Sequence, residues 1–419
     1  MLKTLLKFSI SIIFFIATVH ASDKRIMQVG EILDLAEKNS PLVTAAEFQE
    51  IAANKAINIS LAGYYPVFNF EAIDSRGFPG SNSWIGVKGL MGSPFRKGLA
   101  GGLVVKQTIW DFGRTAADVK ASKYTQEYAK QNIKVTSYEV KQLALETYYE
   151  CARFRTLEEI WSDLSRESSI ITTEVKKFVS TGQRSIVDKY LSEAQTEEAS
   201  TAKAYYTESL KGVIHQLSVL TGLPDHSFTC PSLLSQRSLS LNDPESPFIA
   251  RAKAELNIAA AKLVREKADL FPKIVTVASM GGMQETHLVD RKEYSIGLGV
   301  IVPLFDLTTI GGIQRASAIV SAKCEDVQAQ IQFIDEMNAK FDTVIDASAV
   351  RLNHLSKELK LAIEAFELAK KRYFALEGEL IDSREAFRNL ARAKVETEDT
   401  RANLLIARGS KMLLNGAGN

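Results

Sequence analysis

The sequence has little of what several classes of protein require. Its 419 residues include 10 prolines and three cysteines, and 51 basic residues face 50 acidic ones for a formal net charge of +1. This balance leaves no basic excess to neutralise phosphates, which argues against nucleic acid as a partner. Few prolines, together with 46% hydrophobic and 24% charged residues, favour continuous helix over a multidomain enzyme.

Long apolar runs are also missing. Beyond the first 21 residues, no segment reaches about 18 uninterrupted apolar residues, the length that a membrane-spanning helix needs. Residues 1–21 carry two lysines, an apolar stretch and the ending Val19-His20-Ala21, a pattern that predicts a cleaved secretory signal peptide. We therefore expect an exported protein without a transmembrane helix.

The residues that build metal sites, disulfide frameworks and enzyme centres are sparse. Cys151, Cys230 and Cys324 are widely spaced and odd in number, so they indicate neither a disulfide framework nor a CxxC metal site, and we interpret all three as packing residues. The five histidines lack the spacing of metal ligands. The sequence therefore predicts no enzyme, no metal site and no cofactor.

What the sequence does contain is a repeat of itself. Pro41 and Pro66 in the first half match Pro247 and Pro272 in the second, both at an offset of 206 residues and both in similar surroundings. Such self-similarity is typical of a duplicated architecture.

The match continues towards the end of each half. Residues 109–112 parallel 304–307 at an offset of 195, and Gly182 parallels Gly378 at an offset of 196. Each glycine interrupts two long helical segments, where a glycine can adopt the left-handed conformation that reverses the chain. Each half thus reads as helix, variable insert, long helix, glycine break and helix.

These matches set the expected boundaries. We expect a first repeat over 22–222, a linker over 223–246 and a second repeat over 247–419. The inserts at 67–109 and 273–302 are rich in β-branched and aromatic residues around Gly-rich loops, which predicts one β-hairpin in each.

The last predicted strand alternates cleanly. From Tyr294 to Val302, large apolar residues occupy one face, and Ser295, Gly297 and Gly299 occupy the other. A soluble sheet would bury the apolar face against a helix, whereas a membrane strand would turn it to lipid and its small residues to a lumen. The alternation fits both arrangements.

The rest of the chain predicts helices of unusual length. Residues 113–180 contain no proline, and at about 1.5 Å per residue an unbroken helix of this length spans roughly 100 Å. Steps of three and four recur in a stripe of apolar and small residues, which indicates coiled-coil packing. That stripe contains Leu359, Ala362, Phe366, Ala369 and Tyr373.

Two hairpins per chain pose a physical problem if the protein lies in a membrane. An open sheet edge in hydrocarbon leaves backbone groups unpaired at several kcal/mol each, so only a closed barrel is stable there. Four strands are too few to close. Several copies related by cyclic symmetry would solve this, with each copy donating two hairpins.

At this point the sequence resembles the TolC-like outer-membrane efflux proteins, also called outer membrane factors, over nearly all of the expected mature chain. The resembling segments are Ser40-Pro41, Ser246-Pro247, Pro66, Pro272, 109–114, 178–188 and 220–224. The resemblance implies a mainly α fold with duplicated long-helix hairpins, and four strands per chain contributing to a trimeric, twelve-stranded transmembrane β-barrel continued by a coiled-coil tunnel. It further implies an outer-membrane location in a Gram-negative bacterium, with the helices in the periplasm.

The resemblance also implies a function and partners. The chain would be the exit duct of a tripartite efflux pump or a type I secretion system, passing small molecules or polypeptides from an inner-membrane pump or ABC transporter and a periplasmic adaptor. Two alternatives remain: a periplasmic adaptor, or a structural coiled coil without a pore. An adaptor should carry one hairpin flanked by compact β-domains, and the duplication argues against it.

The resemblance places the functional residues around the two glycine breaks. It makes Tyr373, Asp382 and Glu385 candidates for a gate, although Leu380 stands where the family gate often has arginine. Rings of acidic side chains across a pore favour cations. The candidate adaptor contacts are Thr181, Gly182, Gln183, Arg184, Glu377, Gly378 and Glu379.

Overall fold

The structure, a computed structural model, describes residues 25–75, 98–231, 233, 246–285, 288–304 and 306–415. The expected signal peptide, 1–21, lies outside these residues. The chain divides into two compact units. Unit 1 holds the described residues up to 35 and those within 146–237 and 354–402, and unit 2 holds those within 36–145, 238–353 and 403–419. Each unit therefore draws on both halves of the sequence.

Most of the described residues are helical. Two helices have 67 and 68 residues, which confirms the prediction of long helices without proline. No described helix is both long enough and apolar enough to span a membrane. In chain order the helices are α1 (Val29–Asn39), α2 (Pro41–Leu61), the short 3₁₀ helix η1 (Ala62–Tyr64), α3 (Arg114–Ser180), α4 (Ile186–Thr221), α5 (Pro247–Ala268), α6 (Leu307–Phe374) and α7 (Leu380–Leu414).

The helix starts repeat between the halves. Helices α2 and α5 both begin with proline in the first turn after a serine N-cap. Proline is well tolerated there, because the N–H that it lacks would have no partner within the helix. Asp111 accepts hydrogen bonds from Gly113 N at 3.2 Å and Thr115 N at 2.8 Å just before α3. Asp306 accepts one from Thr308 N at 2.8 Å just before α6.

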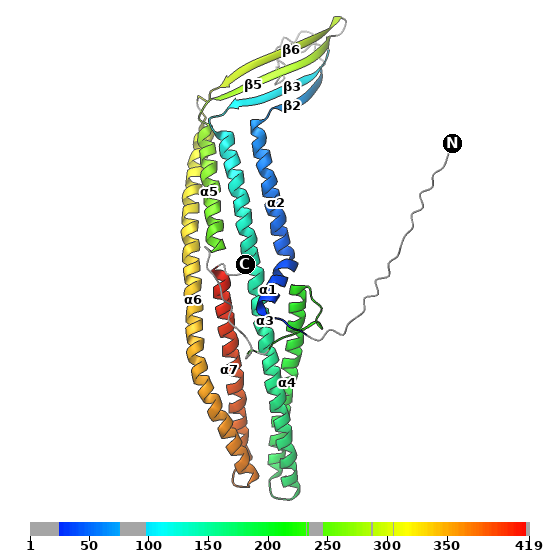
Figure 1. Cartoon of the computed structure of the whole chain (residues 1–419), viewed down its shortest axis with the longest axis vertical. Helices are drawn as coiled ribbons and strands as arrows, with labels where there is room; N and C mark the ends of the chain where they lie inside the picture. Colours follow the sequence, from blue (N-terminus) through cyan, green and yellow to red (C-terminus); the bar gives the residue numbers. More distant parts are fainter. Residues whose placement is uncertain are drawn as a thin grey trace, which may run out of the picture. The chain divides into compact units, whose positions relative to one another are not determined.

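The sheet in unit 2 combines both predicted hairpins. Its strands lie in the order β2-β3-β5-β6, and every neighbouring pair is antiparallel (Figure 1). The prediction of four strands in two hairpins is confirmed, and the pairing of β3 with β5 joins the two halves. The bounds are β2 (Val67–Ser75), β3 (Gly98–Trp110), β5 (Lys273–Glu285) and β6 (Leu288–Ile301).

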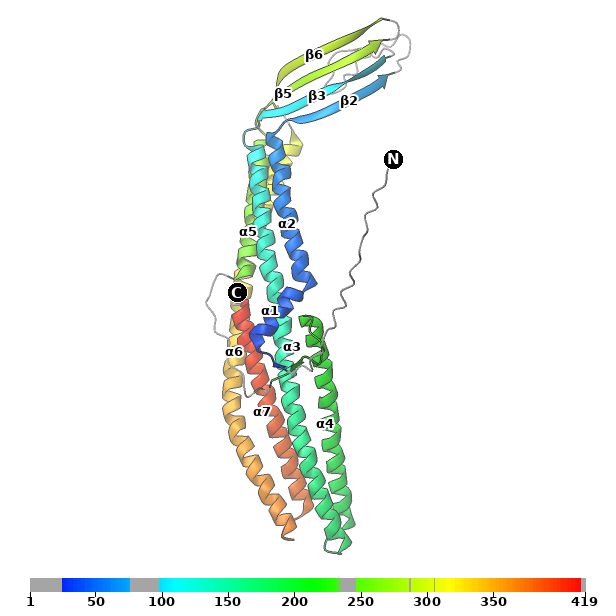
Figure 2. The ribbon, with the colours of Figure 1, turned by 45° about the vertical axis from the view of Figure 1, so that its right-hand side comes forward.

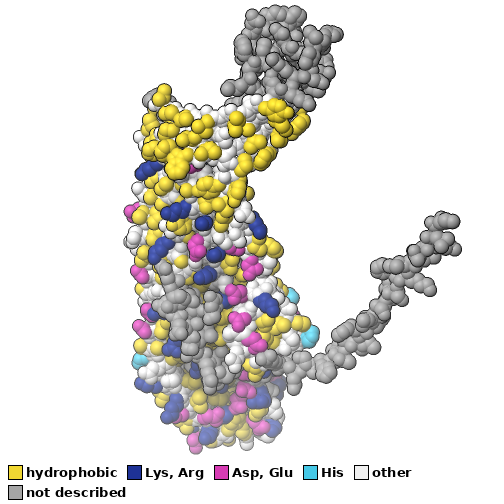
Figure 3. All heavy atoms as spheres, turned by 45° about the horizontal axis from the view of Figure 1, so that its top comes forward, with side chains coloured by type: hydrophobic (Ala, Val, Ile, Leu, Met, Phe, Trp, Pro, Cys, Tyr) yellow, Lys and Arg dark blue, Asp and Glu magenta, His cyan; other side chains and the backbone are white. Residues whose placement is uncertain are grey.

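The strand register gathers large apolar side chains on one face of this sheet. Directly paired residues share a face, so the alternation predicted for β6 extends across all four strands. Ile296 is 83% exposed, and hydrophobic side chains gather over the sheet in Figure 3. The face includes Phe68, Phe70, Leu103, Val105, Ile274, Ala278, Met280, Tyr294, Ile296, Leu298 and Val300, with Gln107 and Thr276 as polar members.

The opposite face mixes valines with small and polar residues. It carries an ion pair between Lys106 and Glu71 at 3.5 Å. Its glycines lie where the strands approach closely: a Cβ on Gly102 would meet the carbonyl oxygen of Met280 at 2.6 Å. Gly281, its partner across β3 and β5, is equally crowded, since a Cβ there would lie 2.8 Å from Gly101 O. Only glycine fits these two positions without a shift of the backbone.

Unit 1 contains two helical hairpins. Helix α4 lies along the C-terminal part of α3, and α7 lies along the C-terminal part of α6 (Figure 2). Buried apolar residues from all four helices form one cluster, which contains Leu164, Ile171, Val175, Ala199, Phe366, Tyr373, Leu380, Phe387, Leu390 and Ala391. Phe366 and Tyr373 belong to the stripe that the sequence analysis identified, so that stripe is a packed helix face.

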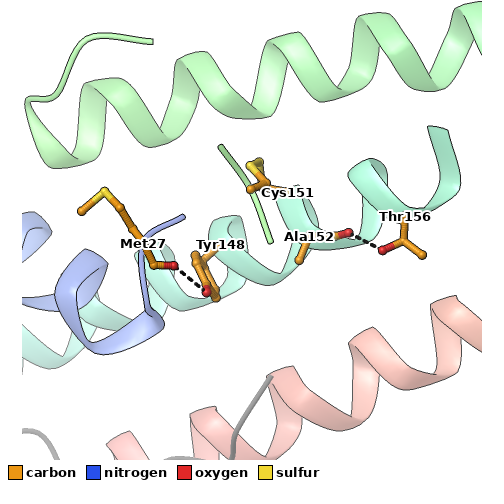
Figure 4. The surroundings of a disulfide bond; sticks show 6 residues. Met27, Tyr148, Cys151, Ala152 and Thr156 are labelled. Atoms are coloured by element: carbon orange, nitrogen blue, oxygen red, sulfur yellow. Dashed lines mark hydrogen bonds between the residues drawn. A yellow bond between two sulfur atoms is a disulfide. The ribbon is translucent and has the colours of Figure 1, made fainter. Parts of the chain in front are cut away.

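The cysteines differ from their prediction. Cys151 of α3 and Cys230 form a disulfide, with their Cα atoms 5.8 Å apart (Figure 4), while Cys324 is free and exposed. None of the three is therefore a simple packing residue. The sequence concealed the pair because its members lie 79 residues apart, and only the return of the chain from α4 to α3 brings them together.

The disulfide lies beside a small parallel pair of strands. β1 (Arg25–Ile26) pairs with β4 (Phe228–Thr229), which falls inside the segment predicted as a linker. The hydroxyl of Tyr148 donates a hydrogen bond to Met27 O at 3.1 Å, which attaches the start of the described chain to α3 (Figure 4).

Candidate functional site

The candidate site is built from two short turns in unit 1. Residues 181–185 join α3 to α4, and residues 375–379 join α6 to α7. Both turns have the same pair of backbone hydrogen bonds, which together define a Schellman motif. The bonds that span five residues are Gln183 N to Phe178 O at 2.9 Å and Glu377 N to Arg372 O at 3.0 Å. Those that span three residues are Gly182 N to Val179 O and Leu376 N to Tyr373 O, both at 3.1 Å.

This geometry corrects the match between the two glycines. Gly182 has φ 75°, as predicted for a residue that reverses the chain, but the equivalent residue of the second turn is Leu376, with φ 64°. The turns align at an offset of 194 residues, which pairs Gly378 with Arg184 instead. The prediction that Gly378 adopts the left-handed conformation is wrong, because the Schellman hydrogen bonds fix that conformation two residues earlier.

Arg184 connects the first turn to the second. Its Nη2 atom donates hydrogen bonds to Tyr373 O at 2.9 Å and to Gly378 O at 2.8 Å. Its guanidinium carbon lies 4.4 Å from the centroid of the Tyr373 ring, within cation–π range. The carbonyl of Tyr373 belongs to the last turn of α6, which is the negative end of the helix dipole, so a cation is favourable there.

Tyr373 is the most enclosed residue of the site. Its side chain is 1% exposed, and its hydroxyl donates a hydrogen bond to Asp188 Oδ2 at 3.1 Å. Burial raises the pKa of Tyr373, and the charge of Asp188 and the hydrogen bond to it raise it further. The phenol therefore stays a neutral donor throughout the physiological range.

Polar contacts between the two hairpins extend away from the turns. Lys370 Nζ lies 2.7 Å from Glu167 Oε1, linking α6 to α3, and Arg388 Nη2 lies 2.9 Å from Glu198 Oε2, linking α7 to α4. The hydrogen bond from Tyr373 to Asp188 is thus one of several that join the α6/α7 hairpin to the α3/α4 hairpin. Together these contacts can hold the two turns in one arrangement.

Comparison with known proteins identifies the fold. No protein-family model and no curated protein matches the sequence. Among solved structures, the outer membrane protein VceC from Vibrio cholerae is similar over 93% of this chain and 96% of its own, with a TM-score of 0.79 and 17% identity. The chain has the fold of outer-membrane channel proteins.

Two further structures agree with this assignment. The CmeC outer membrane channel of Campylobacter jejuni matches 93% of this chain and 85% of its own at a TM-score of 0.79 and 15% identity. The MtrE outer membrane channel of Neisseria gonorrhoeae, in its open state, matches 93% of this chain and 89% of its own, at a TM-score of 0.76 and 15% identity. These channel structures confirm the expected resemblance to TolC-like proteins at the level of the fold.

Within this outer-membrane channel fold, the other two gate candidates differ from Tyr373. Asp382 and Glu385 lie three residues apart near the start of α7, and both are exposed. In the described part of the chain neither carboxylate forms a hydrogen bond or an ion pair. Asp382 is the counterpart of Asp188 at the offset of 194, so the two hairpins carry acids at equivalent positions but in different surroundings.

The candidate adaptor contacts also divide into two groups. Thr181, Gly182, Gln183, Glu377 and Glu379 are exposed, whereas Arg184 and Gly378 are half-buried and contact each other. The described residues contain no group of three or more potential metal ligands.

Sequence reasoning missed Asp188 as the partner of Tyr373, although the aspartate stands in the segment 178–188 that carried the resemblance. The signal that could have found it is the offset of 194, which pairs Asp188 with the gate candidate Asp382. Leu380, in the place where the family gate often has arginine, is 3% exposed and packs in the apolar cluster. In this chain the guanidinium near Tyr373 comes from Arg184.

Proposed function

We propose that the chain is the outer-membrane exit duct of a tripartite efflux pump, acting as a homotrimer that passes small molecules or polypeptides to the exterior. The observation that carries this proposal is the four-stranded sheet, which has an exposed apolar face and a mixed, partly polar face. Such a sheet suits lipid on one side and a water-filled lumen on the other. The similarity to outer-membrane channel structures supports the same assignment.

The strand directions allow copies of the chain to join into a barrel. In the order β2-β3-β5-β6, with every pair antiparallel, β2 and β6 are the open edges and run in opposite directions. The β6 edge of one copy can therefore continue, still antiparallel, into the β2 edge of the next. Three copies would give twelve strands and leave no edge unpaired in the membrane.

The helices next to these two edges carry exposed apolar residues. Helix α2 leads into β2 through η1, and α6 follows β6, so closure of the barrel brings the α2 of one copy towards the α6 of its neighbour. On α2 the exposed apolar residues are Leu42, Phe48, Ile51 and Ile59, and on the unit 2 part of α6 they include Ile319, Phe333 and Val344. A neighbouring copy would remove these side chains from water.

The site at the turns would be the periplasmic end of the duct. Tyr373, Asp382 and Glu385 are the proposed gate residues: Tyr373 would hold the hairpins of one chain together, and the two exposed acids would form rings around the pore axis. Rings of carboxylates favour cations and repel one another, so they would make the pore cation-selective. The exposed turn residues Thr181, Gln183, Glu377 and Glu379 would meet a periplasmic adaptor.

The disulfide gives independent support for export. Buried disulfides persist in oxidising compartments such as the bacterial periplasm and are rare in the cytosol. The disulfide between Cys151 and Cys230 therefore agrees with the export that the predicted signal peptide implies. We place the sheet in the outer membrane of a Gram-negative bacterium and the helices in the periplasm.

The alternative function, a coiled-coil protein or adaptor without a pore, would leave the apolar face of the sheet exposed to water. Single-channel conductance of the purified mature protein in planar bilayers separates these functions. We expect cation-selective pores whose selectivity falls in Asp382→Ala and Glu385→Ala, with Glu364→Ala on α6 as a matched exposed control. A protein that is extracted without detergent as a monomer would refute the duct.

A further inference from the structure

The Cys151–Cys230 disulfide has no role in the proposed duct, and its surroundings suggest one. It attaches the segment after α4 to the middle of α3, next to the point where the described chain begins. A second contact holds the same segment, since the backbone N–H of Leu233 donates a hydrogen bond to Thr156 Oγ1 at 3.3 Å. The described residues of the segment 228–233 are thus fixed to α3 at two points, Cys230 and Leu233.

This segment is the only partner of β1 among the described strands. The pair consists of Arg25 with Phe228 and Ile26 with Thr229, two residues on each side. A two-stranded pair of this size is not stable in water by itself. β1 therefore depends on β4 being held in place, and β4 ends at the residue before Cys230.

The contacts that follow β1 are buried. Met27, Val29, Ile32 and Leu33 are each less than 7% exposed, and Met27 O accepts the hydrogen bond from Tyr148, three residues before Cys151. Tyr148, Cys151 and Ala152 follow one another on α3 at steps of three and one, within a single helical turn. The start of the described chain, through Met27, and the segment after α4, through Cys230 and Leu233, hence dock on neighbouring parts of the same helix.

Burial of the disulfide sets the order of events. Cys151 is 0% exposed and Cys230 is 5% exposed. Thiol–disulfide exchange requires a sulfur atom to be reached by another sulfur in line with the bond that breaks, so neither cysteine of the finished fold can be oxidised by another protein. The pair must form before the segment 228–233 and β1 close over α3.

We propose that a periplasmic thiol–disulfide oxidoreductase is an assembly partner of this chain, and that the disulfide it makes fastens the docking strand for β1. The Cys151 or Cys230 thiolate attacks the disulfide of the oxidant and forms a mixed disulfide, and the second cysteine then displaces the oxidant as a dithiol. Two protein thiols lose two electrons and two protons, and the oxidant gains them. This inference rests on the proposed export of the chain.

The order of cysteines fits an oxidant acting alone. Cys151 and Cys230 are consecutive in the sequence, and Cys324, which stays free, follows both. An oxidant that meets cysteines as the chain crosses the inner membrane from its N-terminus pairs the first two before the third arrives. Correct pairing then needs no disulfide isomerase.

The first test counts free thiols in cells. The chain is expressed in a Gram-negative host with or without its periplasmic thiol oxidase, denatured in acid, and labelled with a maleimide polymer. We expect one labelled thiol in the normal host and in a host without the disulfide isomerase, and three in the oxidase-deficient host. One labelled thiol in all three hosts would refute the need for the oxidant. Three labelled thiols in the normal host would refute the disulfide.

The second test asks what the disulfide fastens. Amide hydrogen exchange is compared between the purified wild type and a Cys151→Ala/Cys230→Ala variant, with Cys324→Ala as the matched control. We expect the amides of residues 26–29 and 228–229 to exchange at least tenfold faster in the double variant, and those of β3 and β5 to keep their protection. Unchanged exchange at 26–29, or loss of protection across the sheet as well, would overturn the fastening role. Neither result depends on conductance, so the duct is tested separately.

Discussion

The hydroxyl of Tyr373 in α6 donates a 3.1 Å hydrogen bond to Asp188 in α4, and so connects the two helical hairpins of unit 1. The arrangement is asymmetric, because the residue equivalent to Tyr373 in the first hairpin is Val179, which has no donor to offer. Arg184 stacks on the same ring and adds two hydrogen bonds. Three residues from two hairpins therefore form one network.

Replacing Tyr373 by phenylalanine tests the hydroxyl alone. The ring keeps its packing and its contact with Arg184, but Asp188 loses a donor, and a hydrogen bond to a charged group contributes about 1.5–3 kcal/mol. We expect the open probability in planar bilayers to rise at least tenfold. Tyr190→Phe is the control, since Tyr190 is 62% exposed and has no hydrogen bond to the other hairpin. Equal open probabilities would remove the hydroxyl from the gate.

Arg184→Lys tests the geometry of the cation. Lysine keeps the charge, but it lacks the planar guanidinium that stacks on an aromatic ring while donating to two carbonyls. We expect the variant to lose about 1–2 kcal/mol of local stability, seen as faster hydrogen exchange at residues 375–379. Gln183→Ala, in the same turn but exposed, should leave that exchange unchanged. If lysine matched arginine, the charge alone would explain the contact.

Removing glycine from the first turn and introducing it in the second should change the free energy of unfolding in opposite directions. Gly182→Ala should lower the free energy of unfolding by about 1–2 kcal/mol, because the left-handed conformation is unfavourable for a residue with a Cβ. Nothing lies within 4 Å of the position of that Cβ, so the loss would be conformational. Leu376→Gly should raise the free energy of unfolding by about 0.5–1 kcal/mol, because glycine adopts the left-handed conformation without strain. Little packing is lost, since Leu376 is 49% exposed. Chemical denaturation in detergent measures both changes, and effects of the same sign would contradict the alignment of the turns.

Arg401→Met should make the stability depend more steeply on pH. Glu398 is 8% exposed, and burial raises its pKa, while the charge of Arg401 and the hydrogen bonds from it, both at 2.6 Å, work in the opposite direction. Removing Arg401 should raise the pKa of Glu398 further. A carboxyl with a raised pKa in the folded state contributes its stability below its unfolded pKa, and that contribution is lost as the pH rises through the folded value.

The expected result is a melting temperature that falls in Arg401→Met as the pH rises above the ordinary pKa of a glutamate, with a loss of about 3 kcal/mol at neutral pH. The double variant Glu398→Gln/Arg401→Met should lose this added pH dependence, because residue 398 then has no carboxyl to ionise. Differential scanning calorimetry of the three proteins at four pH values checks the sign. A flat profile in Arg401→Met would mean that Glu398 reaches solvent.

Patterns that depend on local chemistry were visible in the sequence. The serine–proline starts of α2 and α5, the absence of proline from α3 and the alternation of β6 each reflect what a residue does to its own backbone or its own face. They were enough to predict the long helices and the two hairpins.

Contacts set by tertiary packing were not visible. Cys151 and Cys230 become neighbours only when α4 returns along α3, and Asp188 meets Tyr373 only when the two hairpins pack. The match of Gly182 with Gly378 failed for a different reason. Leu376 occupies a conformation that glycine normally takes, so residue identity was a poor guide to the backbone.

The pairing of β3 with β5 makes the two halves of the sequence parts of one sheet. In an assembly of identical chains that each carried one half, every chain would have the same turn. A contact that needs arginine on one side and tyrosine on the other would then require both residues in every turn. Covalent linkage removes that requirement. One turn could become the donor of a guanidinium and the other its acceptor, and mutations in either turn are free to change one side of the contact at a time.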